Sequence, residues 1–304
     1  MLSFSILIPT YNRKAKLQAV LERLGCQEGI EQGEVIVGID GSSDGTEEWM
    51  QGTYGTRSTG SGQAPGTDGT KGRMQNISWF RIENSGRSVI RNRLLERARG
   101  EIVIFIQDDI LVTEGWLRAI LQFHQQKRGA LVGHMTWYPE VAVTPYMKWL
   151  ENGGHMLDFS GFREGDEMDF WHFYMGNISF PRDLVGDLRF QESVPSYGWE
   201  DILFGYEFVS RGNKVYYSAS ALAYHWDEYR EEDLREYMIK VGRSAVWAEQ
   251  QYPGIGIVPP LWKRTLFRCL IFVGFILRPF LSRETRWYLD MKQWFLQAVE
   301  EDRR

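Results

Sequence analysis

The segment EIVIFIQDD, residues 101–109, carries the clearest indication of the fold. It contains an uninterrupted run of β-branched and aromatic residues at 102–106, and it ends in two carboxylates, Asp108 and Asp109. Such a run is typical of a strand buried on both faces of a parallel sheet. Ligands of open parallel sheets bind beyond the carboxyl ends of the strands. The segment therefore predicts a buried strand with a candidate binding site at its end.

Similar apolar runs occur earlier in the chain, at SFSILIP (3–9), EVIVGID (34–40) and ISWFRIE (77–83). Segments with helical spacing follow them, beginning near Arg13, Thr46 and Ser88. Alternation of strands and helices favours a parallel sheet covered by helices. We therefore predict an α/β protein with a mostly parallel central sheet.

The alternation ends after a helix at 113–127 and a strand at 130–138. Residues 137–174 hold ten aromatic residues and are predicted to be rich in loops. A helix is expected at 198–212, followed by a pair of strands that ends at His225. We expect a domain at 1–226 and a helical extension at 227–304 broken at Pro279.

Residues 52–72 contain 14 glycine, serine or threonine residues in 21 positions. Burial cannot offset the entropy of ordering such a segment, so we predict a mobile surface loop. Its glycines are irregularly spaced and no strand leads into it, which argues against a phosphate-binding loop.

Composition excludes several classes of protein. The 304 residues include 35 lysines and arginines against 40 acids, a net charge of -5, which argues against nucleic acid as a partner. The cysteines, Cys26 and Cys269, are too far apart in sequence for a metal motif, and we interpret them as reduced thiols. The N-terminal apolar run precedes the first basic residue, unlike a secretory signal, so we expect a cytoplasmic protein.

Carboxylates follow two of the predicted strands, at Asp40 and at the pair Asp108 and Asp109. Adjacent carboxylates repel each other unless a positive charge lies beside them, and Mg2+ or Mn2+ reaches proteins through one or two carboxylates plus substrate phosphates. The pattern therefore predicts a site for a divalent cation and a diphosphate. The alternative is that these aspartates only form turns.

The chain resembles family 2 glycosyltransferases over roughly residues 3–226, about three quarters of its length. The segments that carry the resemblance are SILIPTYNR (5–13), IDGSSDGT (39–46), ENSGRSVIRNR (83–93), FIQDD (105–109) and GWEDILFGYEF (198–208), with His225 after them. The resemblance implies a GT-A fold, in which residues 1–110 would form the nucleotide-sugar half and residues 111–226 the acceptor half. It also implies transfer of a hexose or N-acetylhexosamine, with inversion, from a nucleoside diphosphate to a hydroxyl. The implied donor is a UDP-sugar, and the implied role is glycan or polysaccharide synthesis.

The resemblance also implies roles for individual residues. Asp40 would bind the base, Asp108 the ribose or sugar, and Asp109 the metal, with His225 as a further ligand. A lone histidine is otherwise more often structural, and His124, His134, His155 and His172 are assigned no role. Gln107 stands where the family usually has a first aspartate, which puts selectivity at the ribose or sugar in doubt. The remaining donor-binding residues would be Pro9, Tyr11, Asn12, Arg13, Asn84, Gly86 and Arg91.

The family places its general base in a Glu-Asp pair that opens a helix, which here is Glu200 and Asp201. We expect Asp201 to take the proton of the acceptor and Glu200 to position the acceptor. A helix N-terminus stabilises the charged form of such a carboxylate. The alternative is that both are ordinary acids of a first helical turn.

The aromatic segment and its neighbours are the expected acceptor site, where flat rings suit sugar C–H surfaces and apolar acceptors. The candidates are Trp137, Tyr138, Trp171 and Trp199. The alternative for each is packing in the core or in a lid. The acceptor would be a glycan, a lipid-linked molecule or another hydroxyl compound.

The C-terminal region is locally basic, because residues 261–286 hold six basic residues and one acid among many apolar ones. A helix of this kind suits the surface of an anionic membrane, which would place the enzyme at the inner face of the membrane. The alternatives are a helix packed on the domain or on another subunit of a homo-oligomer.

Two other functions compete with a transferase. A nucleotidyltransferase usually has a glycine-rich basic loop after its first strand, whereas residues 9–13 here are Pro-Thr-Tyr-Asn-Arg. A non-catalytic sugar-nucleotide binding protein would not need Asp40, Asp109 and Asp201, although Gln107 is compatible with it.

Overall fold

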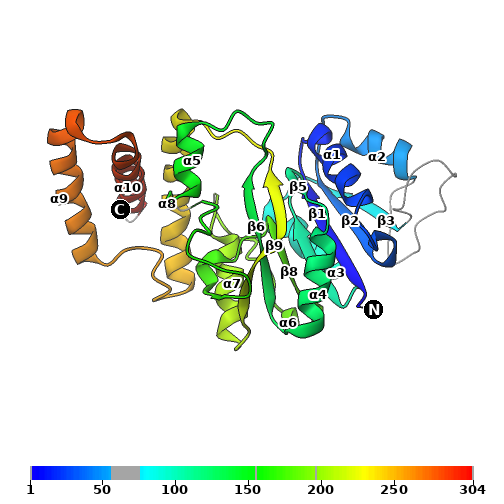
Figure 1. Ribbon diagram of the computed structural model, residues 1–304. Coiled ribbons are helices and arrows are strands. Elements are labelled where there is room, and N and C mark those ends of the chain that lie inside the picture. Colours follow the sequence, from blue (N-terminus) through cyan, green and yellow to red (C-terminus); the bar gives the residue numbers. More distant parts are fainter. Residues whose placement is uncertain (1, 56–75, 155, 196, 303–304) are drawn as a thin grey trace. The chain divides into compact units, whose positions relative to one another are not determined.

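The computed structural model describes residues 2–55, 76–154, 156–195 and 197–302. The chain forms two compact units, of which the first comprises residues 1–141, 161–192 and 204–227 (Figure 1). The second comprises 142–160, 193–203 and 228–304. Of the predicted mobile loop, residues 52–54 belong to a helix, and residues 56–72 lie outside the described part of the chain.

The first unit is built on one nine-stranded sheet in the order β3-β2-β1-β4-β8-β6-β9-β5, with β7 paired to β9. Pairing is parallel for β1–β2, β2–β3, β1–β4 and β6–β9 and antiparallel for the others, so six of the nine strands run in one direction. The predicted mostly parallel sheet is confirmed. The strands are β1 (Phe4–Thr10), β2 (Glu34–Asp40), β3 (Ile77–Ile82), β4 (Ile102–Ile106), β5 (Ile110–Val112), β6 (Ala130–Trp137), β7 (Glu167–Met168), β8 (Asn177–Pro181) and β9 (Val215–His225).

Two strands differ from the sequence expectation. The predicted pair before His225 is one strand, β9, whose register with β6 shifts between Gly133 and Met135. The extra residues of β9 are absorbed by this irregularity and need no turn. The three-residue strand β5 was not expected, and it pairs with the end of β9, with Ile110 opposite His225. This pairing brings His225 to the end of the sheet where Asp109 lies.

Helices cover the sheet because each has one apolar face. In the first unit α3 (Arg87–Arg97) packs on β1 and β2, α1 (Lys14–Gly25) on β5, α4 (Trp116–Gln126) on β9, and α2 (Thr46–Tyr54) on β3. The short helix α6 (Arg182–Val185) contacts β8. A cluster of buried aromatic rings joins the sheet to α7 (Glu200–Ser210); Phe190 and Phe204 stack in it at 4.4 Å.

The second unit is helical. It contains α5 (Pro145–Glu151), α8 (Leu234–Gln251), α9 (Leu261–Leu277) and α10 (Arg283–Glu301), and α10 packs against both α8 and α9. The rings of Tyr146 and Trp149 on α5 pack on Trp287 of α10. Within the described residues, no helix combines the length and the apolar character needed to cross a membrane.

Candidate active site

Asp40 ends β2 and ties together two loops at the carboxyl edge of the sheet. The side chain is buried, and its two oxygens accept hydrogen bonds from the backbone N–H groups of Ser85 (2.8 Å) and Gly86 (3.0 Å). These N–H groups precede α3, where the helix dipole favours a negative charge. Gly41, with φ +73°, has no side chain and so allows the backbone at Asn84 to lie close to it, because a Cβ at Gly41 would lie 2.6 Å from the Asn84 nitrogen.

The turn after β1 is fixed against the turn after β2. The backbone N–H of Asn12 donates to Ser42 Oγ at 3.0 Å, and Asn12 Oδ1 accepts from the Ser43 nitrogen at 2.7 Å. Asn12 adopts φ +52°, a conformation that asparagine tolerates better than most residues. Tyr11 beside it is half exposed, and Pro9 is partly buried in β1. The first predicted motif therefore forms a rigid rim with an exposed aromatic ring.

Asp108 and Asp109 lie directly after β4 and are both buried. The guanidinium of Arg13 bonds to Asp109 and lies 3.6 Å from Asp108 Oδ1. Burial and the adjacent Asp109 charge raise the pKa of Asp108 to about 7, and Arg13 opposes that rise. The two carboxylates thus share one cationic partner from the chain itself.

Sequence reasoning missed two residues of this cluster, Asp227 and Lys16. Asp227 accepts from Arg13 Nη2 at 3.1 Å, and its other oxygen lies 3.1 Å from Lys16 Nζ. Burial alone would lower the pKa of Arg13, but the charges of Asp109, Asp108 and Asp227 outweigh it and raise the pKa. Signals were present in the sequence, since Asp227 stands two positions after His225 and Lys16 lies one helical turn after Arg13.

His225 is buried at the end of β9, next to Asp109. The Trp226 nitrogen donates to the Asp109 carbonyl at 2.8 Å, and the ring of Trp137 meets the imidazole edge to face at 5.7 Å. Burial lowers the pKa of His225, although the negative charges of Asp109 and Asp227 act to raise it. The lower pKa favours the neutral imidazole, which is the form that binds metals.

The described residues contain no cluster of three or more histidine, cysteine, aspartate or glutamate side chains that could hold a metal. Asp109 Oδ1, however, is buried and has no hydrogen-bond partner among them. Two adjacent carboxylates, one with an unsatisfied oxygen, fit a hard cation that takes its other ligands from substrate phosphates and water. They do not fit a metal held by protein ligands alone.

The remaining predicted donor residues lie around α3. Asn84 and Gly86 are exposed in the turn before the helix, and Gly86 has φ +93°. Arg91 is 2% exposed, and its guanidinium lies 5.4 Å from the centre of the Phe190 ring. Asn84 and Gly86 are therefore accessible at the sheet edge, whereas the Arg91 side chain is buried.

Glu200 and Asp201 form the first turn of α7 as predicted from the sequence and belong to the second compact unit. Glu200 is buried and Asp201 is partly exposed. Trp199 precedes them with φ +74°, a strained conformation for a bulky residue. Its indole N–H donates to the Val241 carbonyl of α8 at 2.8 Å, which holds the strained turn in place.

The aromatic residues that were predicted to bind the acceptor differ from one another in burial and in contacts. Trp137 is buried against His225, and Tyr138 packs near Trp226 with ring centres 6.1 Å apart. Trp171 is partly exposed and stacks on Phe170. Trp137 and Tyr138 thus stand beside the carboxylate cluster in the first unit.

The histidines without an assigned role make other contacts. His124 Nε2 lies 2.8 Å from Ser179 Oγ, His134 Nδ1 lies 2.8 Å from the Tyr217 hydroxyl, and His172 Nδ1 lies 2.7 Å from Asp169. His155 lies outside the described residues.

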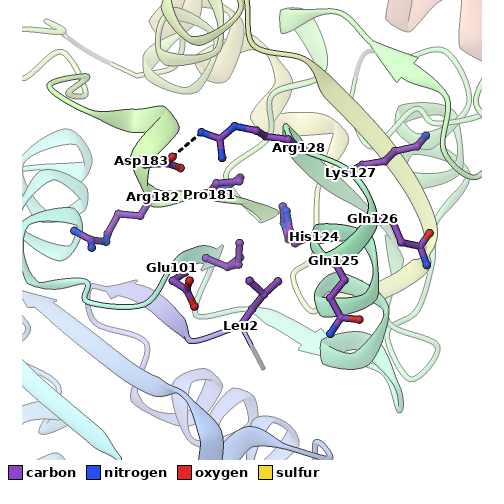
Figure 2. Close-up of a pocket in the computed structure, with 11 residues that line it drawn as sticks. Leu2, Glu101, His124, Gln125, Gln126, Lys127, Arg128, Pro181, Arg182 and Asp183 are labelled. Atoms are coloured by element: carbon purple, nitrogen blue, oxygen red, sulfur yellow. Dashed lines mark hydrogen bonds and ion pairs between the residues drawn. The ribbon is translucent and has the colours of Figure 1, made fainter.

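A cavity of about 530 Å³ lies at the opposite edge of the sheet, near the starts of β1 and β4 (Figure 2). Figure 2 shows Arg128 and Asp183 paired on its wall and His124 among the lining residues. Arg128 Nη2 donates to Asp183 Oδ2 at 2.5 Å. None of the predicted site residues lines it. Ligands of parallel sheets bind at the other edge, so the cavity is not our candidate site.

The fold and the group of acids at the strand ends define the class of the protein. Residues 5–180 match the sequence model of the family described as glycosyl transferase family 2, and the chain belongs to this family. Its α/β architecture is a GT-A fold. The predicted family is confirmed.

Individual relatives support the same class. The uncharacterized glycosyltransferase YfnE of Bacillus subtilis (strain 168) is 32% identical over 255 residues, a match that spans 68% of this chain and 60% of the relative. The crystal structure of S. aureus TarS 1-349 in complex with UDP-GlcNAc has a TM-score of 0.56 at 16% identity, covering 99% of this chain and 91% of that one. Mannosyltransferase PcManGT from Pyrobaculum calidifontis, in complex with GDP-Man and Mn2+, gives 0.58 at 15% identity and covers 98% and 86%.

Proposed function

We propose that the protein transfers a hexose or N-acetylhexosamine from a UDP-sugar to a hydroxyl acceptor, with inversion at the anomeric carbon. The observation that carries the proposal is the group of buried acids, Asp40, Asp108 and Asp109, beyond the ends of parallel strands. Such strand ends are where open α/β sheets bind nucleotides. Solved structures of similar fold are described as complexes with UDP-GlcNAc or GDP-Man, which supports a nucleotide-sugar donor.

The nucleotide would bind along the rim formed by the first two turns. Asp40 would accept a hydrogen bond from the base in addition to those from Ser85 and Gly86, because a carboxylate offers about four acceptor sites. Tyr11 would stack on the base or ribose, and Asp108 would bind the ribose or the sugar. The other contributing residues would be Pro9, Asn12, Arg13, Asn84, Gly86 and Arg91.

The leaving diphosphate needs its charge neutralised, and Asp109 and His225 would hold a divalent cation, Mn2+ or Mg2+, for this purpose. A bound cation would stabilise the negative charge of the departing nucleotide. The chain contributes the neutral His225 imidazole and the buried Oδ1 of Asp109. Arg13 is a second positive charge at the same place, and it would move from Asp109 toward the phosphates as they bind.

An inverting transfer needs a carboxylate that takes the proton of the attacking hydroxyl. We assign this role to Asp201, whose partial exposure leaves it accessible to an acceptor, and we assign acceptor positioning to Glu200. The first turn of α7 stabilises the charged base. The acceptor would be a glycan, a lipid-linked molecule or another hydroxyl compound, and it would contact the aromatic side chains of Trp137, Tyr138, Trp171 and Trp199. The reaction would serve glycan synthesis in the cytoplasm, at the inner face of the membrane.

A donor screen tests the proposal. The protein is incubated with a panel of UDP-, GDP- and dTDP-sugars, with Mn2+, with Mg2+ and with a chelator, and release of nucleoside diphosphate is measured. We expect release from one UDP-sugar that needs a divalent cation. A protein that binds and releases no nucleotide under any condition would refute the transferase, and binding without release would support a non-catalytic protein.

A further inference from the structure

The outward side of α9 presents an unusual concentration of exposed apolar side chains. Twelve large apolar residues are exposed in the described chain, and ten of them lie between 261 and 280. Leu261 is 67% exposed, Trp262 64% and Phe272 66%. Scattered exposed apolar residues are normal, but a contiguous group of this size marks an interaction surface.

One side of α9 is occupied by α10, as Figure 1 shows. Gly274 is buried there, and a Cβ at this position would lie 2.3 Å from a Leu289 methyl group. Arg264, Phe267 and Ile271 are partly buried on the same side, at the spacing of successive helical turns.

The opposite side of α9 carries no charged residue. With about 3.6 residues per turn, the uncharged residues cover roughly half of the helix circumference. Lys263 and Arg268 lie at its two edges. We call this surface the α9 face: Leu261, Trp262, Thr265, Leu266, Cys269, Leu270, Phe272, Val273, Ile276 and Leu277.

The charge around the α9 face is positive. Residues 261–286 hold six basic residues and one acid. Arg268 pairs with Glu300, and Arg278 pairs with Asp290 at 2.8 Å. Lys263 makes no ion pair with any described acidic residue, so its edge keeps free positive charge.

The sign of this charge decides between two occupants. A second copy of the chain, joined through the same face, would place basic edges against basic edges, and like charges repel. A bilayer with anionic headgroups would receive the apolar face in its boundary region and attract both edges. Trp262 and Phe272 suit that boundary, where aromatic rings are favoured.

We propose that the α9 face docks on an anionic lipid bilayer, with α9 parallel to the membrane plane. Its apolar side chains would lie at the boundary between the headgroups and the acyl chains. The second unit is thereby a peripheral membrane-binding module. The proposal concerns α9 and its edges alone, and it holds whichever sugar the protein transfers.

Co-sedimentation with vesicles tests the proposal on the full chain. We expect binding to vesicles of equal parts phosphatidylcholine and phosphatidylglycerol, weakening as salt is added, and little binding to phosphatidylcholine alone. Replacing two exposed apolar residues with charges, Phe272→Glu and Ile276→Glu together, should lower the partition coefficient by about tenfold or more. The pair Lys263→Gln and Arg268→Gln, which removes the basic residue at each edge, should lower it several-fold, and only on the anionic vesicles.

Matched substitutions on α8 separate the α9 face from the remaining surface. Tyr237→Glu adds a charge at another exposed apolar residue, and Lys240→Gln with Arg235→Gln removes two exposed basic residues. These variants should bind vesicles like the parent protein. Circular dichroism and nucleotide binding would establish that every variant is folded.

A fluorophore on Cys269 gives an independent measurement, because both cysteines are free and exposed and Cys26→Ser leaves Cys269 as the labelling site. Its emission should shift to the blue on anionic vesicles. Equal vesicle binding by the parent and the Phe272→Glu, Ile276→Glu protein would overturn the proposal. Self-association in sedimentation velocity that the same substitutions abolish, without vesicle binding, would instead identify an interface between copies.

Discussion

The Arg13 guanidinium donates to the Asp227 carboxylate at 3.1 Å across 214 positions of sequence, and it also bonds to Asp109. One cation thus serves two acids that come from different strand ends. If a divalent cation and a diphosphate bind at Asp109 and displace Arg13 from it, Arg13 still has Asp227 as an ion-pair partner. Asp227, supported by Lys16, would keep the guanidinium beside the site during this exchange.

Asp227→Asn should therefore weaken metal-dependent nucleotide binding. A partly exposed ion pair contributes about 1 kcal/mol, so we expect affinity for UDP with Mn2+ to fall roughly fivefold in calorimetry. Asp109→Asn should remove the difference between Mn2+ and chelator altogether. Asp187→Asn, which breaks the surface pair with Arg211, is the control and should bind like the parent. Unchanged binding by the Asp227 variant would show that Arg13 needs no second partner.

Asp40→Asn should affect both stability and nucleotide binding. The amide keeps one acceptor oxygen and loses the other, so one of the two backbone N–H groups before α3 loses its partner, at about 1–2 kcal/mol. Urea denaturation measures this loss, and calorimetry with UDP should show weaker binding. Asp44→Asn is the matched control in the same loop, because it too keeps one acceptor oxygen and loses the other, so a hydrogen bond from Lys14 or from Thr46 is lost without touching the proposed base pocket. Equal loss of nucleotide affinity in both variants would contradict the role of Asp40.

Asp201→Asn should abolish transfer while donor binding persists. Loss of a general base lowers kcat by roughly 10²–10⁴-fold, whereas the affinity for the nucleotide depends on residues of the first unit. Single-turnover kinetics and nucleotide calorimetry on one preparation separate the two effects. Glu207→Gln, on the same helix two turns further along, should leave kcat within a factor of a few. Normal turnover by the Asp201 variant would assign the base to another residue.

Local sequence patterns predicted the N-terminal half of the sheet well, because each strand is a continuous apolar run with a polar stop. Asp40 and Asp108 follow such runs, and both lie at the carboxyl edge where they were expected. Helix α5 was missed, although Thr144 caps it and Pro145 occupies its first turn, a readable start signal. The segment around it is rich in aromatic residues without a clear helical spacing, and it was therefore predicted to be rich in loops.

Long-range pairing explains what the sequence could not indicate. β5 has only three residues, too few for a periodic pattern, yet its pairing with β9 places His225 beside Asp109. The register that turns β9 into one irregular strand depends on its partner β6. For the same reason the sequence did not indicate Asp227 and Lys16. The contacts of Asp227 with Lys16 and with Arg13 form only because β9 and α1 return to the same edge of the sheet.

Protonation of His124 should make the fold sensitive to acid. His124 on α4 is largely buried, with Nε2 against Ser179, and burial lowers its pKa to about 4 from an ordinary 6.5. Above pH 6.5 the ring is neutral in the folded and unfolded chain and has no effect. As the pH falls from 6.5 toward 4, the unfolded chain takes up the proton first, so the free energy of unfolding decreases.

At roughly pH 5 this linkage lowers the free energy of unfolding by about 2 kcal/mol. His124→Gln cannot take up the proton, so its urea stability should change between neutral pH and pH 5 by about that much less than the parent's. Ser179→Ala is the matched control, because it removes the hydrogen-bond partner but keeps the ionisable ring, and it should retain the full pH dependence. An identical pH response in the parent and the His124 variant would mean that the ring takes up its proton equally in both states.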